Sequence, residues 1–291
     1  VNTKKQIYAQ AFAIYALTEY FLATDDHKSL QYAKDLYKLV EAHSFDRQHN
    51  GYLEAFDQEW NLLDDLRLSD KDANEKKTMN THLHLLEAYT NLYRCWPAAD
   101  VGHQLRNLIQ LFLEKIIDDQ QHFQLFFDER WNVKSAMVSF GHDIEGSWLL
   151  QEAAEVLGDE QLIRVTKAKA VVMTDTTIRE GMDIDGGLMN ERHGNGSLDR
   201  DKHWWPQAEA LVGFVNAWQN TGSPYYLEHA ARVWQFIEEK LIDREAGEWF
   251  WRVDANGSVI RLEEKAGPWK CPYHNGRALL ELLSRLEQSG V

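Results

Sequence analysis

The chain is poor in cysteine and has no long apolar run. Its two cysteines among 291 residues, Cys95 and Cys271, lie far apart and outside any CxxC spacing. This excludes a disulfide framework and is typical of a reducing cytoplasm, where we expect the protein to be located. No apolar run approaches the roughly 20 residues that cross a bilayer, so we expect no membrane partner.

Basic residues are also scarce. The sequence has 31 Lys and Arg against 46 Asp and Glu, which gives a formal charge of −15. Nucleic-acid binding depends on clustered Lys and Arg that neutralise phosphates, so this balance argues against a nucleic-acid partner. What the chain has in excess is aromatic rings, with 11 Trp, 11 Tyr and 12 Phe, together with 12 His. Flat rings with polar edges suit the faces of sugars.

Apolar residues recur at three- and four-residue spacing in nine segments, which predicts nine helices. We expect them at about 4–23, 29–43, 77–94, 98–118, 143–157, 160–180, 204–219, 224–241 and 274–288. The first eight helices form four pairs, and each pair is followed by a short strand-like segment bounded by turn residues. These segments are 52–56, 123–128, 185–191 and 247–251, and Asn256-Gly257 is expected to turn a hairpin after the last of them.

The strand-like segments are spaced regularly. Measured from Gly51, Phe123, Gly187 and Glu248, the spacings are 72, 64 and 61 residues. A repeat of two helices and a β element indicates either an open solenoid or a closed toroid of hairpins. The β element in every repeat favours the toroid, so we predict an all-α (α/α)6 barrel formed by one domain over residues 1–291. Six repeats require twelve helices, so nine helices predict a barrel that is incomplete at its N-terminus.

Two stretches place histidines on predicted helices with other polar groups. In 76–84, Asn80 and His84 share a helix face, whereas His82 points to the opposite side. Taken alone, this stretch is explained better by a polar pair that is hydrogen-bonded in the core. In 139–148, His142 falls in the first turn of a helix, where the helix dipole disfavours the imidazolium and keeps the ring available as a base. Glu145 either orients that ring or belongs to a capping box in which Asp143 is the cap.

Two further stretches combine aromatic rings with a titratable group. In 203–210, Trp205 and Glu209 place a ring and a carboxylate on one face at a helix start. Buried packing explains the tandem Trp204 and Trp205 about as well as a place at the mouth of a pocket. In 267–277, His274 again lies at a helix start, after two prolines and near Trp269.

Histidines at helix starts among aromatic rings suit proton abstraction next to a carbonyl, the chemistry of sugar epimerases and isomerases. A glycoside hydrolase would instead need two carboxylates that flank the scissile bond. Glu145 and Glu209 could be assigned these roles, but the histidines would then have none. A zinc site is disfavoured, because there is no HExxH motif and the two cysteines lack ligand spacing.

At these residues the sequence resembles a known family. The motifs GHDIEGSWLL, WWPQAEALVGF and KAGPWKCPYHNGRALLEL closely resemble the cellobiose 2-epimerases of the N-acylglucosamine 2-epimerase superfamily. The motifs KQIYAQAFAIYAL, LRLSD and KKTMNTHLHLLEAYTNLY match the same family. The resemblance is collinear and covers essentially the whole chain.

The resemblance implies an (α/α)6 barrel that epimerises C2 of the reducing-end glucose of β-1,4-linked disaccharides, without a metal or nucleotide cofactor. His142 and His274 match the two histidines that remove and return the C2 proton through a cis-enediolate. His84 matches a residue that stabilises the developing charge on the sugar oxygens. The matching sugar-binding residues are Tyr8, Asn80, Glu145, Trp205 or its neighbour Trp204, and Trp269, and we add Glu209 because it shares a helix face with Trp205.

Other activities stay open at this point. An N-acylglucosamine 2-epimerase or a mannose/glucose isomerase is the alternative within the superfamily. Family members begin three helices earlier, with an arginine that lines the sugar site, and no residue here can stand for it. An inactive sugar-binding or interaction module is therefore the alternative of a different class. As partners we expect a small disaccharide and, at most, a weak homodimer.

Overall fold

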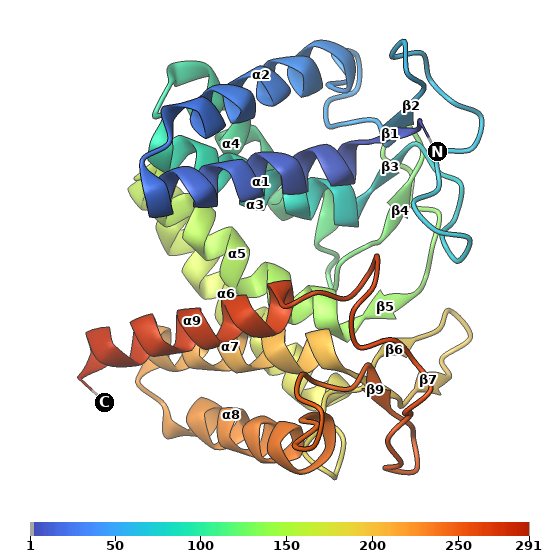
Figure 1. The fold of residues 1–291 in the computed structure, drawn as a ribbon, viewed down its shortest axis with the longest axis vertical. Helices are drawn as coiled ribbons and strands as arrows, with labels where there is room; N and C mark the ends of the chain where they lie inside the picture. The colour runs from blue at the N-terminus through green and yellow to red at the C-terminus, as the bar shows by residue number, and fades with distance from the viewer. Residues whose placement is uncertain (1–2, 291) are drawn as a thin grey trace. The chain divides into compact units, whose positions relative to one another are not determined.

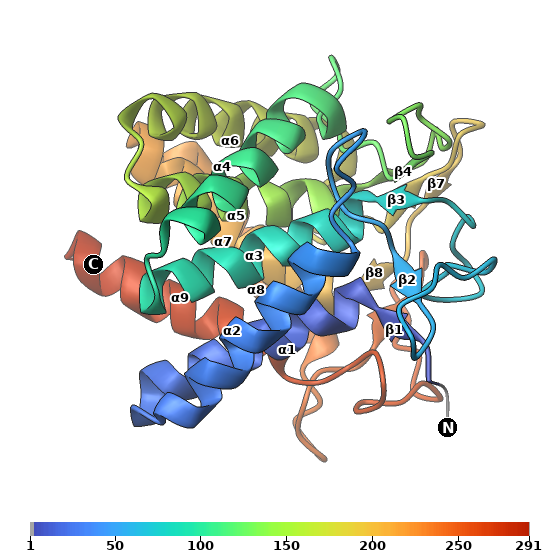
Figure 2. The ribbon, with the colours of Figure 1, turned by 90° about the horizontal axis from the view of Figure 1, so that it is seen from above.

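The structure is a computed structural model that describes residues 3–290. Within this range the chain forms nine α-helices, with two-residue strands in the loops before α1 and between successive helix pairs (Figures 1 and 2). The helices are α1 Ile7–Thr24, α2 His27–His43, α3 Met79–Cys95, α4 Ala99–Leu111, α5 Phe140–Leu157, α6 Glu160–Gly181, α7 Trp204–Thr221, α8 Pro224–Phe236 and α9 Tyr273–Ser289. Each corresponds to a predicted helix. None of the helices in residues 3–290 is both long and apolar enough to cross a bilayer.

Two helices end in a wider turn that the sequence did not predict. The backbone N–H of Ile117 donates to the carbonyl of Phe112 at 2.9 Å, and that of Ile242 donates to Ile237 at 3.0 Å. These bonds span five residues, so α4 and α8 are each followed by a π-helical turn, Phe112–Ile116 and Ile237–Leu241. The apolar spacing continues through both turns, which is why 98–118 and 224–241 were predicted as uninterrupted helices.

Two-residue strands form small antiparallel ladders beside the helix starts. The pairs are β1 Lys5–Gln6 with β2 Ala55–Phe56, β3 Lys77–Thr78 with β4 Phe126–Phe127, β5 Val138–Ser139 with β6 Glu191–Arg192, β6 with β7 Leu198–Asp199, and β8 Lys202–His203 with β9 Arg252–Val253. The strands β1, β3, β5 and β8 each directly precede a helix. The predicted segments 52–56 and 123–128 contain β2 and β4, whereas 185–191 reaches only the first residue of β6 and 247–251 ends just before β9. The strands in front of the helices were not predicted, because two residues carry no periodicity of their own.

The chain divides into two compact units, and each is described by itself. The described part of the first unit is 3–118, 123–136 and 149–163. There α1 packs against α2 and α3, and α3 packs against α4. Nearly every residue of α3 up to Leu92 is buried, whereas α2 buries one stripe that includes Ala33, Tyr37 and Val40. Within this unit α3 is an inner helix and α2 an outer one, which are the two layers of an α/α barrel wall.

The described part of the second unit is 119–122, 137–148 and 164–290. Its helix α7 packs against α8 and α9. Most residues of α7 from Trp204 to Ala217 are buried, whereas α8 buries a stripe of Tyr226, Ala230, Val233 and Phe236. The same division into an inner and an outer helix therefore recurs in the second unit.

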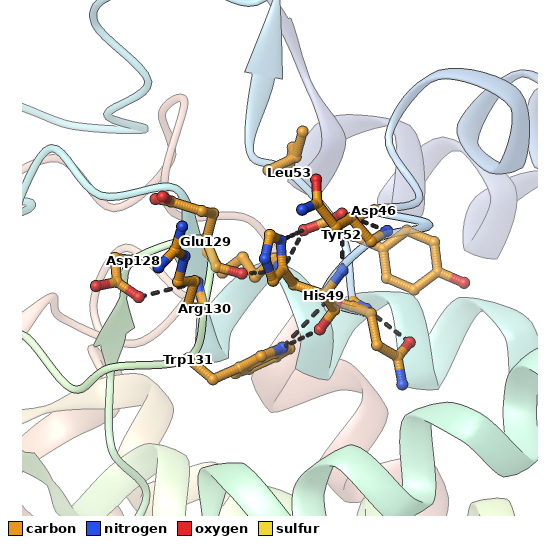
Figure 3. Close-up of polar contacts among 12 residues, drawn as sticks. Asp46, His49, Tyr52, Leu53, Asp128, Glu129, Arg130 and Trp131 are labelled. Atoms are coloured by element: carbon orange, nitrogen blue, oxygen red, sulfur yellow. Dashed lines mark hydrogen bonds and ion pairs between the residues drawn. The ribbon is translucent and has the colours of Figure 1, made fainter.

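Buried lysines hold the turns of the repeats in place. In the first unit the ammonium group of Lys77 donates to Asp46 Oδ2 at 2.8 Å and to the carbonyls of Asn50 and Glu129 at 2.6 and 2.7 Å. The indole N–H of Trp131 donates to the His49 carbonyl at 2.9 Å, so its ring lies against the same turn (Figure 3). In the second unit Lys202 is buried in the same way and pairs with Asp183 at 2.7 Å.

Candidate active site

The starts of α7 and α9 bring a histidine and a carboxylate together in the second unit. Pro206 lies in the first turn of α7, where a missing N–H leaves no bond unmade, and Glu209 follows one turn later. His274 is the second residue of α9. Its Nδ1 lies 2.7 Å from Oε1 of the fully buried Glu209 and 3.9 Å from Oε1 of Glu145. A carboxylate only accepts hydrogen bonds, so Nδ1 of His274 carries a proton.

Arg277, one turn after His274, joins the two carboxylates. Its Nη2 donates to Oε1 of Glu145 at 2.9 Å and to Oε1 of Glu209 at 2.7 Å. The indole N–H of Trp148 donates to the other oxygen of Glu209 at 3.1 Å. Burial is the largest influence on the pKa of Glu209 and raises it, but Arg277 and His274 together outweigh burial and hold this pKa below its usual value. Glu209 is therefore an ionised carboxylate at neutral pH.

The second histidine of the site comes from α5. His142 lies in the first turn of this helix, as predicted, and its Nδ1 is 2.7 Å from Oγ of Ser139. The ring centroid of Trp205 is 4.7 Å from that of His142 and 5.4 Å from that of His274. One tryptophan ring therefore contacts both imidazoles. A Cβ atom on Gly141 would lie 2.4 Å from the Trp205 ring, so the absence of a side chain at Gly141 permits this approach.

The other two tryptophans of the predicted set lie differently. Trp204 is buried, and its ring packs 4.7 Å from Trp251 and edge-on to His274 at 6.3 Å. Of the two tandem tryptophans, Trp205 contacts the imidazoles of both His142 and His274. Trp204 packs beside the imidazole of His274 and against Trp251. Trp269 lies in the loop before α9 with 52% of its surface exposed.

The remaining predicted residues belong to the first unit, on α1 and α3. His84 is buried, with its Nδ1 3.1 Å from Oε2 of Glu87 and its ring 5.1 Å from that of Tyr8. Asn80 is one turn before His84 on α3. Tyr8 and His84 therefore meet where α1 packs on α3, with Asn80 on the same helix.

His82 faces the other way on α3, as predicted, and has a structural role. Its Nε2 accepts the N–H of Tyr52 at 3.0 Å, and its Nδ1 donates to the carbonyl of Thr78 at 2.7 Å. Burial lowers the pKa of His82 to about 4, so the ring is neutral and holds the turn to the helix start.

Comparison with known proteins identifies the family. Residues 1–278 match the N-acylglucosamine 2-epimerase (GlcNAc 2-epimerase) family. The chain belongs to this family. A cellobiose 2-epimerase of Bacteroides fragilis is 53% identical over 285 residues, which cover 97% of this chain and 72% of the relative. A cellobiose 2-epimerase of Ruminococcus albus is 41% identical over 290 residues, which cover 98% of this chain and 72% of the relative.

The fold of this family member agrees with that of a solved relative. The structure of a cellobiose 2-epimerase from Bacillus thermoamylovorans superposes with a TM-score of 0.92 at 42% identity, over 98% of this chain and 73% of that one. This match and the nine helices of residues 3–290 confirm the predicted (α/α)6-barrel class. Membership of the N-acylglucosamine 2-epimerase family also confirms that the chain is a carbohydrate epimerase, an isomerase.

The site of this epimerase contains one group of potential metal ligands. Single ligand atoms of Glu145, Glu209 and His274 lie within 4.8 Å of one another. The guanidinium of Arg277 is hydrogen-bonded to both carboxylates, so a positive charge already lies where a cation would bind. The geometry therefore fits an ion-paired cluster better than a metal centre.

Sequence reasoning missed or misjudged three partners in this epimerase. Arg277 was not proposed, although its spacing of three residues places it on the same helix face as His274. The capping interpretation of Asp143 is replaced by an ion pair, because its Oδ2 lies 2.7 Å from Nδ1 of the buried His122. Glu145, for which a role in orienting His142 and a place in a capping box were both open, has its Oε1 2.9 Å from Nη2 of Arg277 and 3.9 Å from Nδ1 of His274. No local pattern indicates a contact between two different helices.

Proposed function

We propose that this chain epimerises C2 of the reducing-end glucose of a β-1,4-linked disaccharide, converting cellobiose to glucosyl-mannose and lactose to epilactose. The observation that carries the proposal is the position of the Trp205 ring, 4.7 Å from His142 and 5.4 Å from His274. A sugar on such a ring has two imidazoles available for proton transfer. The relatives named cellobiose 2-epimerase, which match 97% or more of this chain, support cellobiose as the substrate.

The reaction we propose is a proton transfer without net oxidation. In the open-chain sugar, one imidazole takes the proton from C2, and the electron pair of the broken C–H bond forms a C1=C2 double bond while the C1 carbonyl oxygen becomes negative. This cis-enediolate then reforms the C1 carbonyl, and C2 takes a proton from the other imidazole on the opposite face. Two histidines, His142 and His274, are therefore sufficient for the chemistry at C2.

The proposed roles of the surrounding residues follow from their chemistry. Glu209, with its depressed pKa, favours the imidazolium form of His274, which suits a proton donor and assistance of ring opening. We assign Trp205 and Trp269 to stacking on the sugar, and Glu145 to the polar wall beside His274. The family resemblance supports assigning Tyr8, Asn80 and His84 to the sugar oxygens and the developing charge.

The test is an incubation with cellobiose in D2O followed by NMR. We expect glucosyl-mannose that carries deuterium at C2. His142→Ala and His274→Ala should each abolish the exchange and leave the thermal unfolding midpoint nearly unchanged. His27→Ala, at a side chain that is 79% exposed, is the matched control and should retain full turnover. Normal turnover in either active-site variant would contradict the assignment.

Two other outcomes separate the alternatives. Formation of N-acetylmannosamine from N-acetylglucosamine, without epimerised cellobiose, would identify an N-acylglucosamine 2-epimerase. Calorimetric binding of cellobiose without deuterium exchange at C2 would identify a sugar-binding module. We also propose a cytoplasmic location, since both cysteines are free thiols. We propose a monomer or weak homodimer, and sedimentation analysis tests this oligomeric state.

A further inference from the structure

Ser139 is the side chain that anchors His142. It is the second residue of β5 and directly precedes α5, and its Oγ lies 2.7 Å from Nδ1 of His142. Only 2% of Ser139 is exposed, and its backbone is held in the β5–β6 ladder opposite Glu191. The hydroxyl is therefore fixed in position on the Nδ1 side of the imidazole.

The equivalent hydroxyl in the first unit does something else. Thr78 also ends a two-residue strand and directly precedes a helix, α3. Its Oγ1 accepts the backbone N–H of Thr81 at 3.1 Å, which is the ordinary bond of a helix cap. In α5 the corresponding third residue is His142, and the Ser139 hydroxyl contacts Nδ1 of its imidazole. The contact of Ser139 is thus suited to orienting a ring.

His142 and His274 are both anchored through Nδ1, but by different chemical groups. Glu209 can only accept a hydrogen bond, so it keeps a proton on Nδ1 of His274. A hydroxyl can either accept or donate, and the two cases leave His142 with opposite tautomers. If Ser139 donated to Nδ1, the neutral ring would carry its proton on Nε2 and could not take another there.

We propose that Ser139 is the positioning residue of His142. Its hydroxyl oxygen accepts a hydrogen bond from Nδ1–H and so makes Nε2 the atom that exchanges the C2 proton. This inference rests on the proposed function, because it concerns the base of that reaction. It adds that the uncharged hydroxyl fixes the ring without the bias toward imidazolium that Glu209 gives His274. His142 is thereby suited to begin a turnover as a neutral base.

The test combines a tautomer measurement with kinetics. In the 15N NMR spectrum of the wild-type protein, we expect neutral His142 to carry its proton on Nδ1. In Ser139→Ala we expect a mixture of tautomers and a kcat for C2 epimerisation that is about 10- to 100-fold lower, with the KM for cellobiose within about twofold. Ser139→Thr retains the hydroxyl and should restore both the tautomer and most of kcat.

The matched control is Ser147→Ala. Ser147 is as buried as Ser139 and lies on α5, the helix that carries His142, but its Oγ donates to the carbonyl of Ile144 at 2.7 Å. This variant should leave the tautomer of His142 and kcat unchanged, which separates the loss of the contact from the general effect of removing a buried hydroxyl.

The outcomes distinguish the inference from the function on which it rests. If the wild-type chain shows no C2 exchange with cellobiose, the proposed function fails, and the 15N spectra still decide whether Ser139 sets the tautomer. If Ser139→Ala keeps the wild-type tautomer, or loses no more kcat than Ser147→Ala, the positioning role is overturned. A wild-type ring protonated on Nε2 would also overturn it.

Discussion

The Nδ1 atom of His274 lies 2.7 Å from the Oε1 atom of the buried Glu209. In Glu209→Gln the charge is lost while the shape is kept, so the imidazolium of His274 is no longer favoured. We expect kcat for C2 exchange to fall by about 100-fold or more. Glu238→Gln, at an exposed carboxylate, should have no effect. Equal kcat values in the two variants would contradict the role of this contact.

Arg277 compensates two buried carboxylates, Glu145 and Glu209, so its removal should affect stability. We expect Arg277→Met to lower the free energy of unfolding at pH 7 by about 3–5 kcal/mol, because both buried carboxylates lose the guanidinium that compensates their charge. Arg277→Lys keeps the charge but not the forked geometry, and should lie between this variant and the wild type. Urea unfolding monitored by tryptophan fluorescence measures the difference.

The pH dependence of the Arg277→Met effect has a definite sign. The pKa of Glu209 is depressed in the folded protein, so its contribution to stability is present above the unfolded pKa of about 4.3 and is lost as the pH falls through the folded value. The difference in unfolding free energy between wild type and variant should therefore be largest near pH 7 and shrink at acidic pH. A difference that does not change with pH would contradict the charge argument.

The helices of the fold were predictable from the sequence because the signal is local. All nine follow from apolar spacing, and the first turns that carry His142, Trp205 and His274 were placed correctly. The two π-helical turns were not predicted, since the apolar spacing continues through them. The strands in front of the helices were not predicted, since they depend on backbone bonds to distant residues. The bond of Ile7 N–H to the carbonyl of Glu54 is one example.

The partners within the candidate site could be predicted only in part. Four-residue spacing placed Trp205 and Glu209 on one helix face, and both contact His274. The bond between Glu145 and Arg277 spans 132 positions and depends on how α5 and α9 pack. The resemblance supplied the names of most site residues, but neither it nor the spacing indicated Ser139 or the partner of Asp143.

Lys77 allows a test of the buried lysines that hold the turns. Its side chain is fully buried, and this burial lowers the pKa of Lys77. The ammonium group nevertheless donates three hydrogen bonds. Lys77→Met should destabilise the protein by about 3 kcal/mol or more, because Asp46 and two carbonyls lose their donor. Lys38→Met removes an exposed pair with Asp35 and should cost no more than about 0.5 kcal/mol. Chemical denaturation of both variants provides the comparison.

Gly141 gives a steric test of the Trp205 position. An added Cβ would lie 2.4 Å from Cη2 of Trp205 and 2.9 Å from Cγ of Pro206, so the Trp205 ring must shift from its position beside the two imidazoles. We expect Gly141→Ala to raise the KM for cellobiose and lower kcat. Gly276→Ala, whose nearest neighbour would be 3.8 Å away, should be tolerated and gain up to about 1 kcal/mol from its better helix propensity. Equal kinetics in the two variants would contradict the proposed stacking role.

The ion pairs of the buried His122 should make the stability of the folded protein depend on pH in the alkaline range. Its ring joins Asp143 of α5 at 2.7 Å to Glu180 of α6 at 3.0 Å, and Arg192 also contacts Glu180. Burial, the largest influence, lowers the pKa of His122, but the two carboxylates outweigh it and the net pKa is raised. The stabilisation is therefore complete below the unfolded pKa of about 6.5 and is lost as the pH rises through the higher folded value.

His122→Asn removes this titration while leaving a polar group between the two helices. From pH 6 to pH 9 the urea midpoint of the wild-type protein should fall, whereas that of the variant should fall less, so that the two curves converge at alkaline pH. His27→Asn, at the exposed end of α2, should follow the wild-type curve throughout. Parallel curves for wild type and His122→Asn would show that the imidazolium does not stabilise the start of α5, where His142 lies.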